Sequence, residues 1–133
     1  MSDENHNQPD KSPGIISWNE LVTKDVAASG KFYSDLFGWT AESMEMPTGN
    51  YTMFKAGERP VAGLLSLPPE AGDVPTMWMG YITVEDLPAA VEKARSLGAH
   101  ICKEITELPM GSFAVVVDPQ GATFGLWKFS GAT

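Results

Sequence analysis

The stretch Trp18–Trp39, WNELVTKDVAASGKFYSDLFGW, predicts a strand, a helix cap, a helix and a helix stop in immediate succession. After the strand, Asp25 can accept hydrogen bonds from the free N–H groups of a first helical turn. Apolar and aromatic residues then recur at three- and four-residue steps, which is typical of an amphipathic helix. Gly38 fits the left-handed position that ends a helix. The face expected to pack on a sheet consists of Val26, Ser29, Phe32, Tyr33, Leu36 and Phe37.

The same pattern returns at Met79–Gly98, MGYITVEDLPAAVEKARSLG. Glu85 or Asp86 is the expected cap of the second helix. Asp25 and Asp86 are 61 positions apart, and Gly63 and Gly125 are 62 apart. Three further apolar segments follow each helix, so each half reads strand, helix, three strands. Two copies of so long a unit indicate a duplicated module rather than a solenoid; the alternative is a chance succession of two α+β units.

The module boundaries follow from composition. Residues 1–13 are polar and aperiodic, and we expect a disordered tail. The first βαβββ module then spans residues 14–67, the proline-rich segment 68–75 is a linker, and the second module spans 76–130. The fold class is α+β, and residues 14–130 form one domain's worth of chain.

Charge and hydropathy exclude several function classes. The formal net charge is −8, from nine basic and seventeen acidic residues, which argues against nucleic-acid binding. No apolar run approaches the roughly 20 residues of a membrane helix. No signal segment is apparent, and the single cysteine, Cys102, fits a reducing compartment. We therefore expect a cytoplasmic protein that binds neither nucleic acid nor membrane.

Alternation along the strands assigns side chains to two faces of a sheet. We expect the helices to pack on the face that carries Leu21, Ile82, Val84, Phe124 and Leu126. The opposite face then carries Trp18, Glu20, Val22, Gly63, Leu65, Met79, Tyr81, Thr83, Gly125, Trp127 and Phe129. Because so many large aromatics rarely stay exposed in a soluble monomer, this second face should be covered by the other module or by another subunit.

The order of these segments resembles the vicinal oxygen chelate superfamily, also called the glyoxalase/bleomycin-resistance/dioxygenase fold. The motifs that carry the resemblance are DVAASGKFYSDLFGW in the first module, and EDLPAAVEKARSLGA with DPQGATFGLW in the second. The resemblance covers about residues 15–130 and is greatest to small stand-alone, glyoxalase-like members. It implies a curved mixed sheet around a cleft between the two modules.

The resemblance also implies a metal site in many members, with His, Gln or Glu ligands from the first and last strand of each module. Carried over by position, the four ligands fall on Trp18, Gly63, Met79 and Gly125. Thioether sulfur is a soft ligand, and tryptophan and glycine side chains offer no lone pair to a divalent cation. We therefore expect no metal and no other cofactor. A shift of two residues would bring in Glu20 as a ligand.

Two kinds of chemistry remain on the second face. Glu20 is a candidate catalytic base or an anchor for a ligand donor; alternatively it is solvated or paired with Lys24, Lys55 or Arg59. An aromatic lining would suit a flat apolar or cationic small molecule, or would instead be the packed core between modules. The candidate ligand-binding residues are Trp18, Glu20, Leu65, Met79, Tyr81, Trp127 and Phe129.

These residues support three hypotheses. The first is a metal-free protein that binds a small aromatic or apolar molecule in the cleft between the modules. The second is an enzyme of the same superfamily, a lyase, isomerase or dioxygenase-like protein, in which Glu20 is a base or a metal ligand. The third is an interaction domain with a filled cleft. A homodimer is expected, because stand-alone two-module members often pair and the outer surface carries spare aromatics.

Overall fold

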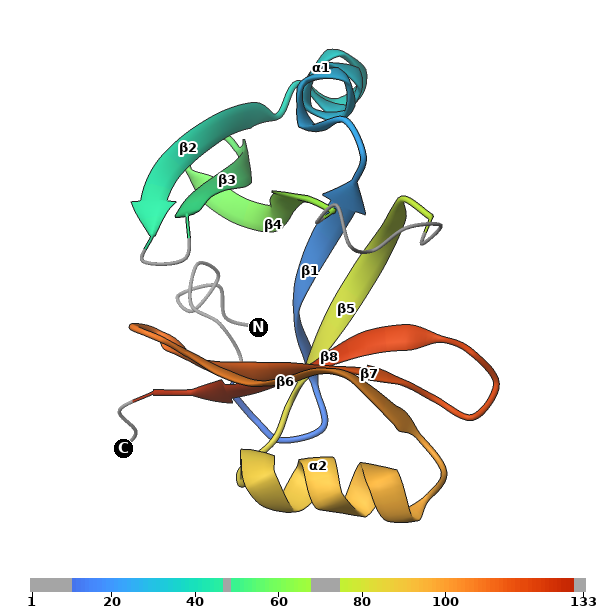
Figure 1. Ribbon diagram of the computed structural model, residues 1–133. Helices are drawn as coiled ribbons and strands as arrows, with labels where there is room; N and C mark the ends of the chain where they lie inside the picture. The colour runs from blue at the N-terminus through green and yellow to red at the C-terminus, as the bar shows by residue number, and fades with distance from the viewer. Residues whose placement is uncertain (1–10, 47–48, 68–74, 131–133) are drawn as a thin grey trace, which may run out of the picture. The chain divides into compact units, whose positions relative to one another are not determined.

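The computed structural model describes residues 11–46, 49–67 and 75–130, which divide into two compact units (Figure 1). One unit runs from Trp18 to Met79. The other comprises residues 11–17 together with residues 80–130. Most of the predicted tail (residues 1–10) and most of the predicted linker (residues 68–74) lie outside the described residues. No helix in the described ranges is long and apolar enough to cross a membrane.

The first unit has the predicted succession of one strand, one helix and three strands. Its elements are β1 (Ile16–Thr23), α1 (Val26–Phe37), β2 (Thr40–Met46), β3 (Gly49–Ala56) and β4 (Arg59–Ser66). β1 pairs with β4 in parallel, and β2, β3 and β4 form an antiparallel meander, giving the order β2-β3-β4-β1. Arg59 is the first residue of β4.

The second unit repeats this arrangement. Its elements are β5 (Met77–Thr83), α2 (Leu87–Ser96), β6 (His100–Leu108), β7 (Gly111–Val117) and β8 (Thr123–Phe129), and the first three residues of β5 still belong to the first unit. β5 pairs with β8 in parallel and the strand order is β5-β8-β7-β6. Figure 1 shows α2 lying along one face of its sheet. The α+β class and the two βαβββ modules are thus confirmed, while the cleft between modules stays a prediction.

Both helices begin at the aspartate that the sequence singled out. The Asp25 carboxylate accepts from the Ala28 N–H at 3.0 Å, and the Asp86 carboxylate accepts from the Ala89 N–H at 3.0 Å. Gly38 ends α1 with φ at +75°, a left-handed conformation that glycine adopts without steric cost. The cap residues therefore fix where each helix starts, and in the first module also where it stops.

Each unit has its own core between helix and sheet. In the first, Leu21, Phe54, Ala62 and Leu64 are buried. In the second, Leu87, Val91, Ala114, Val116 and Leu126 are buried, with Val84 and Phe124 packed against them. Of the residues predicted to face the helices, Leu21, Val84, Phe124 and Leu126 lie in these cores. Ile82 is half-buried and lies outside the described clusters.

The prediction for the buried face of α1 was wrong in part. Val26 and Tyr33 pack on the core, but α1 has no buried residue. Phe32, Leu36 and Phe37 are 57%, 58% and 56% exposed. The apolar positions of α1 extend around more of the helix than one sheet can cover, so helical spacing alone overstated the buried stripe.

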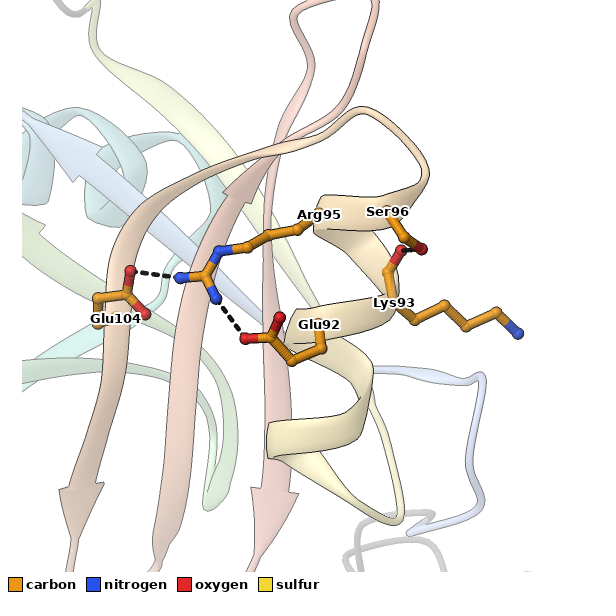
Figure 2. Close-up of polar contacts among 5 residues, drawn as sticks. All are labelled: Glu92, Lys93, Arg95, Ser96 and Glu104. Atoms are coloured by element: carbon orange, nitrogen blue, oxygen red, sulfur yellow. Dashed lines mark hydrogen bonds and ion pairs between the residues drawn. The ribbon is translucent and has the colours of Figure 1, made fainter.

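Arg95 connects α2 to the edge strand of the second unit. Its guanidinium donates to Glu104 on β6 at 2.6 Å and also pairs with Glu92 one turn earlier on α2 (Figure 2). All three side chains are well exposed to solvent, so these ion pairs orient the end of the helix rather than hold the unit together.

Candidate functional site

Glu20 is buried on the face of the first sheet that lies opposite α1. It sits on β1 beside Leu21, whose side chain enters the helix-side core, so the alternation of the strand turns Glu20 to the other face. Its side chain is 6% exposed. The alternative of a solvated carboxylate is therefore wrong, and Lys55 instead pairs with Glu42 at 2.8 Å.

The hydroxyl of Tyr51, on β3, connects Glu20 to Trp18. It donates to Oε2 of Glu20 at 3.0 Å and accepts from Nε1 of Trp18 at 2.9 Å. A hydrogen bond to an ionised carboxylate is stronger than one between neutral groups. Trp18, Tyr51 and Glu20 thus form one hydrogen-bonded array, which we call the Trp–Tyr–Glu array.

The array requires a glycine beneath it. Glu20 is paired with Gly63 across β1 and β4, and Tyr51 lies on the same face as Gly63. A Cβ at residue 63 would meet the Tyr51 hydroxyl at 1.8 Å and Tyr51 Cζ at 2.6 Å. Because nothing larger than hydrogen fits there, Gly63 lets Tyr51 cross the strand and reach Glu20.

Burial and the neighbouring charge keep Tyr51 protonated. Burial contributes most to raising the pKa of the Tyr51 hydroxyl well above its usual value, and the Glu20 carboxylate raises it further. The Trp18 hydrogen bond acts in the opposite direction. Tyr51 is therefore a hydrogen-bond donor to Glu20 over the whole physiological range of pH.

The equivalent face of the second unit is aromatic. Tyr81 on β5 lies over Gly125 of β8, where an added Cβ would meet the tyrosine ring at 2.2 Å. The Tyr81 ring packs edge-on against Phe113, with ring centroids 6.1 Å apart, and Trp127 packs edge-on against Phe129 at 5.7 Å. This face therefore offers ring surfaces for stacking.

The strand registers make the two faces comparable residue by residue. Glu20 pairs with Gly63 as Tyr81 pairs with Gly125. Tyr51 lies two residues before Met53, the partner of Gly63, and Phe113 lies two before Val115, the partner of Gly125. One backbone arrangement thus carries Glu20 with Tyr51 in the first unit and Tyr81 with Phe113 in the second.

The structure places some of the predicted site residues side by side. Trp18 and Glu20 share the array, and Leu65 lies on β4 opposite Val22. Met79 and Tyr81 are buried, at 5% and 6% exposure, and Trp127 and Phe129 are half-buried. That these residues bind a ligand stays a prediction.

Sequence reasoning missed Tyr51. Pairing the β3–β4 hairpin around Gly57 would have placed this tyrosine on the Gly63 face, so a signal was present.

The positions carried over from the family's metal site do not fit a divalent cation. Trp18 uses its only polar atom to donate to Tyr51, and the Tyr51 hydroxyl fills the space above Gly63. Within the described ranges, no three His, Cys, Asp or Glu side chains gather closely enough to hold a metal ion. A single carboxylate with a protonated tyrosine is a poor donor set for such an ion.

Two hollows on the first unit lie away from the Trp–Tyr–Glu array. A groove of about 330 Å³ runs between α1 and the helix side of β2, β3 and β4, with Gly30, Ser34 and Leu64 in its lining. None of the predicted ligand-binding residues lines it.

Comparison with known proteins gives a family match over residues 15–126, to the Glyoxalase/Bleomycin resistance protein/Dioxygenase superfamily. A protein of Mycobacterium tuberculosis named "Putative glyoxylase CFP32" is 40% identical over 117 residues, covering 86% of this chain and 44% of its own length. The anthracycline biosynthesis protein DnrV of Streptomyces peucetius is 33% identical, covering 88% and 48%. The chain spans about half the length of these relatives.

Solved structures with the same fold are more distant in sequence. The hypothetical protein BH1468 of Bacillus halodurans gives a TM-score of 0.63 at 10% identity, covering 92% of this chain and 99% of that one. Streptomyces coelicolor methylmalonyl-CoA epimerase gives 0.60 at 15% identity, covering 90% and 100%. At such identities the likeness shows the fold alone.

Proposed function

Because this chain belongs to the glyoxalase/bleomycin resistance protein/dioxygenase superfamily, whose one fold serves several activities, we propose that it binds a small aromatic or apolar molecule without a metal ion. The observation that carries this proposal is the Trp–Tyr–Glu array. It stands where the family's ligands would lie in the first module, and it replaces a metal-binding donor set with an indole, a phenol and one carboxylate. The protein would act in the cytoplasm.

The two faces suggest the chemistry of the ligand. Ring surfaces such as Trp127 and Tyr81 favour a flat aromatic molecule through stacking. In its ionised form the Glu20 carboxylate only accepts hydrogen bonds, and it then favours a ligand that carries a hydroxyl or a cationic group. One relative is named for anthracycline biosynthesis, and flat polycyclic aromatics are therefore suitable first probes.

A titration of tryptophan fluorescence tests the proposal. Anthraquinone and a hydroxylated anthraquinone are added to the chain after elemental analysis for zinc, nickel, iron and manganese. We expect no stoichiometric metal, a saturable fluorescence change, and tighter binding of the hydroxylated probe. Glu20→Gln should weaken that preference, because an amide NH₂ replaces one of the two acceptor oxygens, whereas Tyr33→Phe, which alters a tyrosine of α1, should keep it. No change with any of a wide panel of aromatics, or a stoichiometric metal, would contradict the proposal.

The second candidate function is an enzyme of the lyase or isomerase kind with Glu20 as base. What favours it is that Glu20 is a buried carboxylate held in place by Tyr51. Glu20→Gln keeps an oxygen that accepts from Tyr51 but no longer takes up a proton. In this reading the variant loses turnover and keeps its melting temperature, whereas a purely structural Glu20 would lower the melting temperature.

A further inference from the structure

The first unit exposes a patch of large apolar side chains on and beside α1. It consists of Phe32, Leu36 and Phe37 on the helix and Trp78 at the start of β5, and we call it the α1 patch. The three helix residues are more than half exposed and Trp78 is 41% exposed. Tyr33 joins them, with ring centroids 4.9 Å from Phe32, 6.3 Å from Phe37 and 5.4 Å from Trp78.

The size of the α1 patch sets it apart from scattered surface residues. Four large side chains at about half exposure present on the order of 400 Å² of apolar surface. The largest patch on a typical soluble monomer is about 300–600 Å² and is often an interaction site. The ring contacts and the Trp78 Nε1 to Tyr33 hydroxyl hydrogen bond, at 3.1 Å, hold the patch in one arrangement. A rigid patch loses little side-chain entropy when it is covered.

We propose that the α1 patch is the contact surface between two copies of this chain, related by a twofold axis across α1. Phe32 and Leu36 lie one turn apart on the same side of the helix. When two such helices cross antiparallel, Phe32 of each copy meets Leu36 of the other, as an isologous interface requires. The inference concerns a surface separate from the Trp–Tyr–Glu array and does not depend on ligand binding.

The charges beside the patch favour a second copy over a strongly basic partner. Lys31 and Asp35 form an ion pair at the edge of the patch, at 2.8 Å. The edge therefore carries one charge of each sign, and a twofold axis brings Lys31 of one copy near Asp35 of the other. Two like copies can approach there despite the net charge of −8 on each chain.

The area of the α1 patch sets how strong a contact between two copies can be. Two patches of about 400 Å² bury about 800 Å², so the polar rim must contribute a few hundred Å² more for the contact to exceed the roughly 1,000 Å² of a specific interface. The dimer should therefore be concentration-dependent, with a dissociation constant of micromolar order.

Sedimentation velocity over a series of protein concentrations tests this interface. We expect a mass that rises from 14.3 kDa toward twice that value as concentration increases. Leu36→Glu, a good helix former at an exposed position, should leave only monomer with an unchanged circular dichroism spectrum. Leu97→Glu is the matched control, because Leu97 is 67% exposed at the end of α2 in the other unit, and it should dimerise as the wild type does.

Each other outcome overturns the proposal. A mass of 14.3 kDa at every concentration would show that a different partner, or a further part of a longer protein, covers the patch. A dimer that Leu36→Glu leaves intact, or that Leu97→Glu also dissociates, would place the interface elsewhere. Growth beyond a dimer would show that the contact is not twofold.

Discussion

Replacing Tyr51 by phenylalanine removes the one atom that joins the Trp–Tyr–Glu array. The hydroxyl takes part in two hydrogen bonds, one of them to a buried carboxylate. A hydrogen bond to a charged group contributes about 1.5–3 kcal/mol, and a buried polar group left without a partner costs about 1–3 kcal/mol. We expect the free energy of unfolding of Tyr51→Phe to fall by about 2–3 kcal/mol in total. With a urea m value of about 2 kcal/mol/M, the midpoint should fall by about 1–1.5 M.

Urea unfolding followed by far-ultraviolet circular dichroism measures this without relying on Trp18 fluorescence. Tyr33→Phe is the matched control, because the Tyr33 hydroxyl also accepts from an indole N–H, that of Trp78, but at an exposed position where water can replace it. Its effect should stay below about 1 kcal/mol. If the two variants lost the same free energy, within about 0.5 kcal/mol, then the buried array would not be the stabilising feature we take it to be.

Three further predictions follow from the same contacts. The folded state raises the pKa of Tyr51, so the folded protein keeps a proton that the unfolded tyrosine loses near pH 10. The free energy of unfolding should therefore fall as pH rises above about 10, and it should fall less in Tyr51→Phe. Urea midpoints at a series of alkaline pH values measure this difference. Gly63→Ala should lower the free energy of unfolding of the wild-type protein by about 1–3 kcal/mol, and that of the Tyr51→Ala variant by much less. An equal loss in both proteins would mean that the Tyr51 side chain is not what prevents a larger residue at position 63. Gly30→Ala should raise the free energy of unfolding by about 0.5–1 kcal/mol, because alanine favours the helix more than glycine does. The added Cβ would meet Leu64 at 3.5 Å, an ordinary contact distance. A lower urea midpoint would show that α1 lies too close to the sheet at this position for a methyl group.

The sequence predicted those parts of the fold that depend on neighbouring residues. Asp25 and Asp86 begin the helices because a carboxylate at that position satisfies N–H groups three residues on. The spacing of 61 to 62 residues marked the duplication because both modules keep the same strand registers. Glu20 pairs with Gly63 in the first module, and Tyr81 pairs with Gly125 in the second. The two members of the second pair lie 61 and 62 positions after those of the first, which is the spacing seen in the sequence.

The parts that were missed depend on residues distant in the chain or on surface that no neighbour covers. Tyr51 reaches Glu20 across 31 positions, and that contact exists only once the hairpin register is set. Helical spacing groups Phe32 and Leu36 with the core residues, but spacing does not tell how wide a face the sheet can bury. The position of Glu20 on the face opposite the helix followed from alternation, whereas its burial and the identity of its hydrogen-bond partner did not.

The matched positions of the two modules have a consequence for how such a protein can diversify. After a duplication, the backbone of each half is maintained by its own caps and core, so the residues above Gly63 and Gly125 are free to diverge separately. Here one half acquired an acid with its donor and the other a pair of rings. The double substitution Glu20→Tyr and Tyr51→Phe would give the first half the same two aromatic residues that the second half has at Tyr81 and Phe113. A chain of this kind is therefore a natural scaffold on which a polar and an apolar half-site can be re-engineered one at a time.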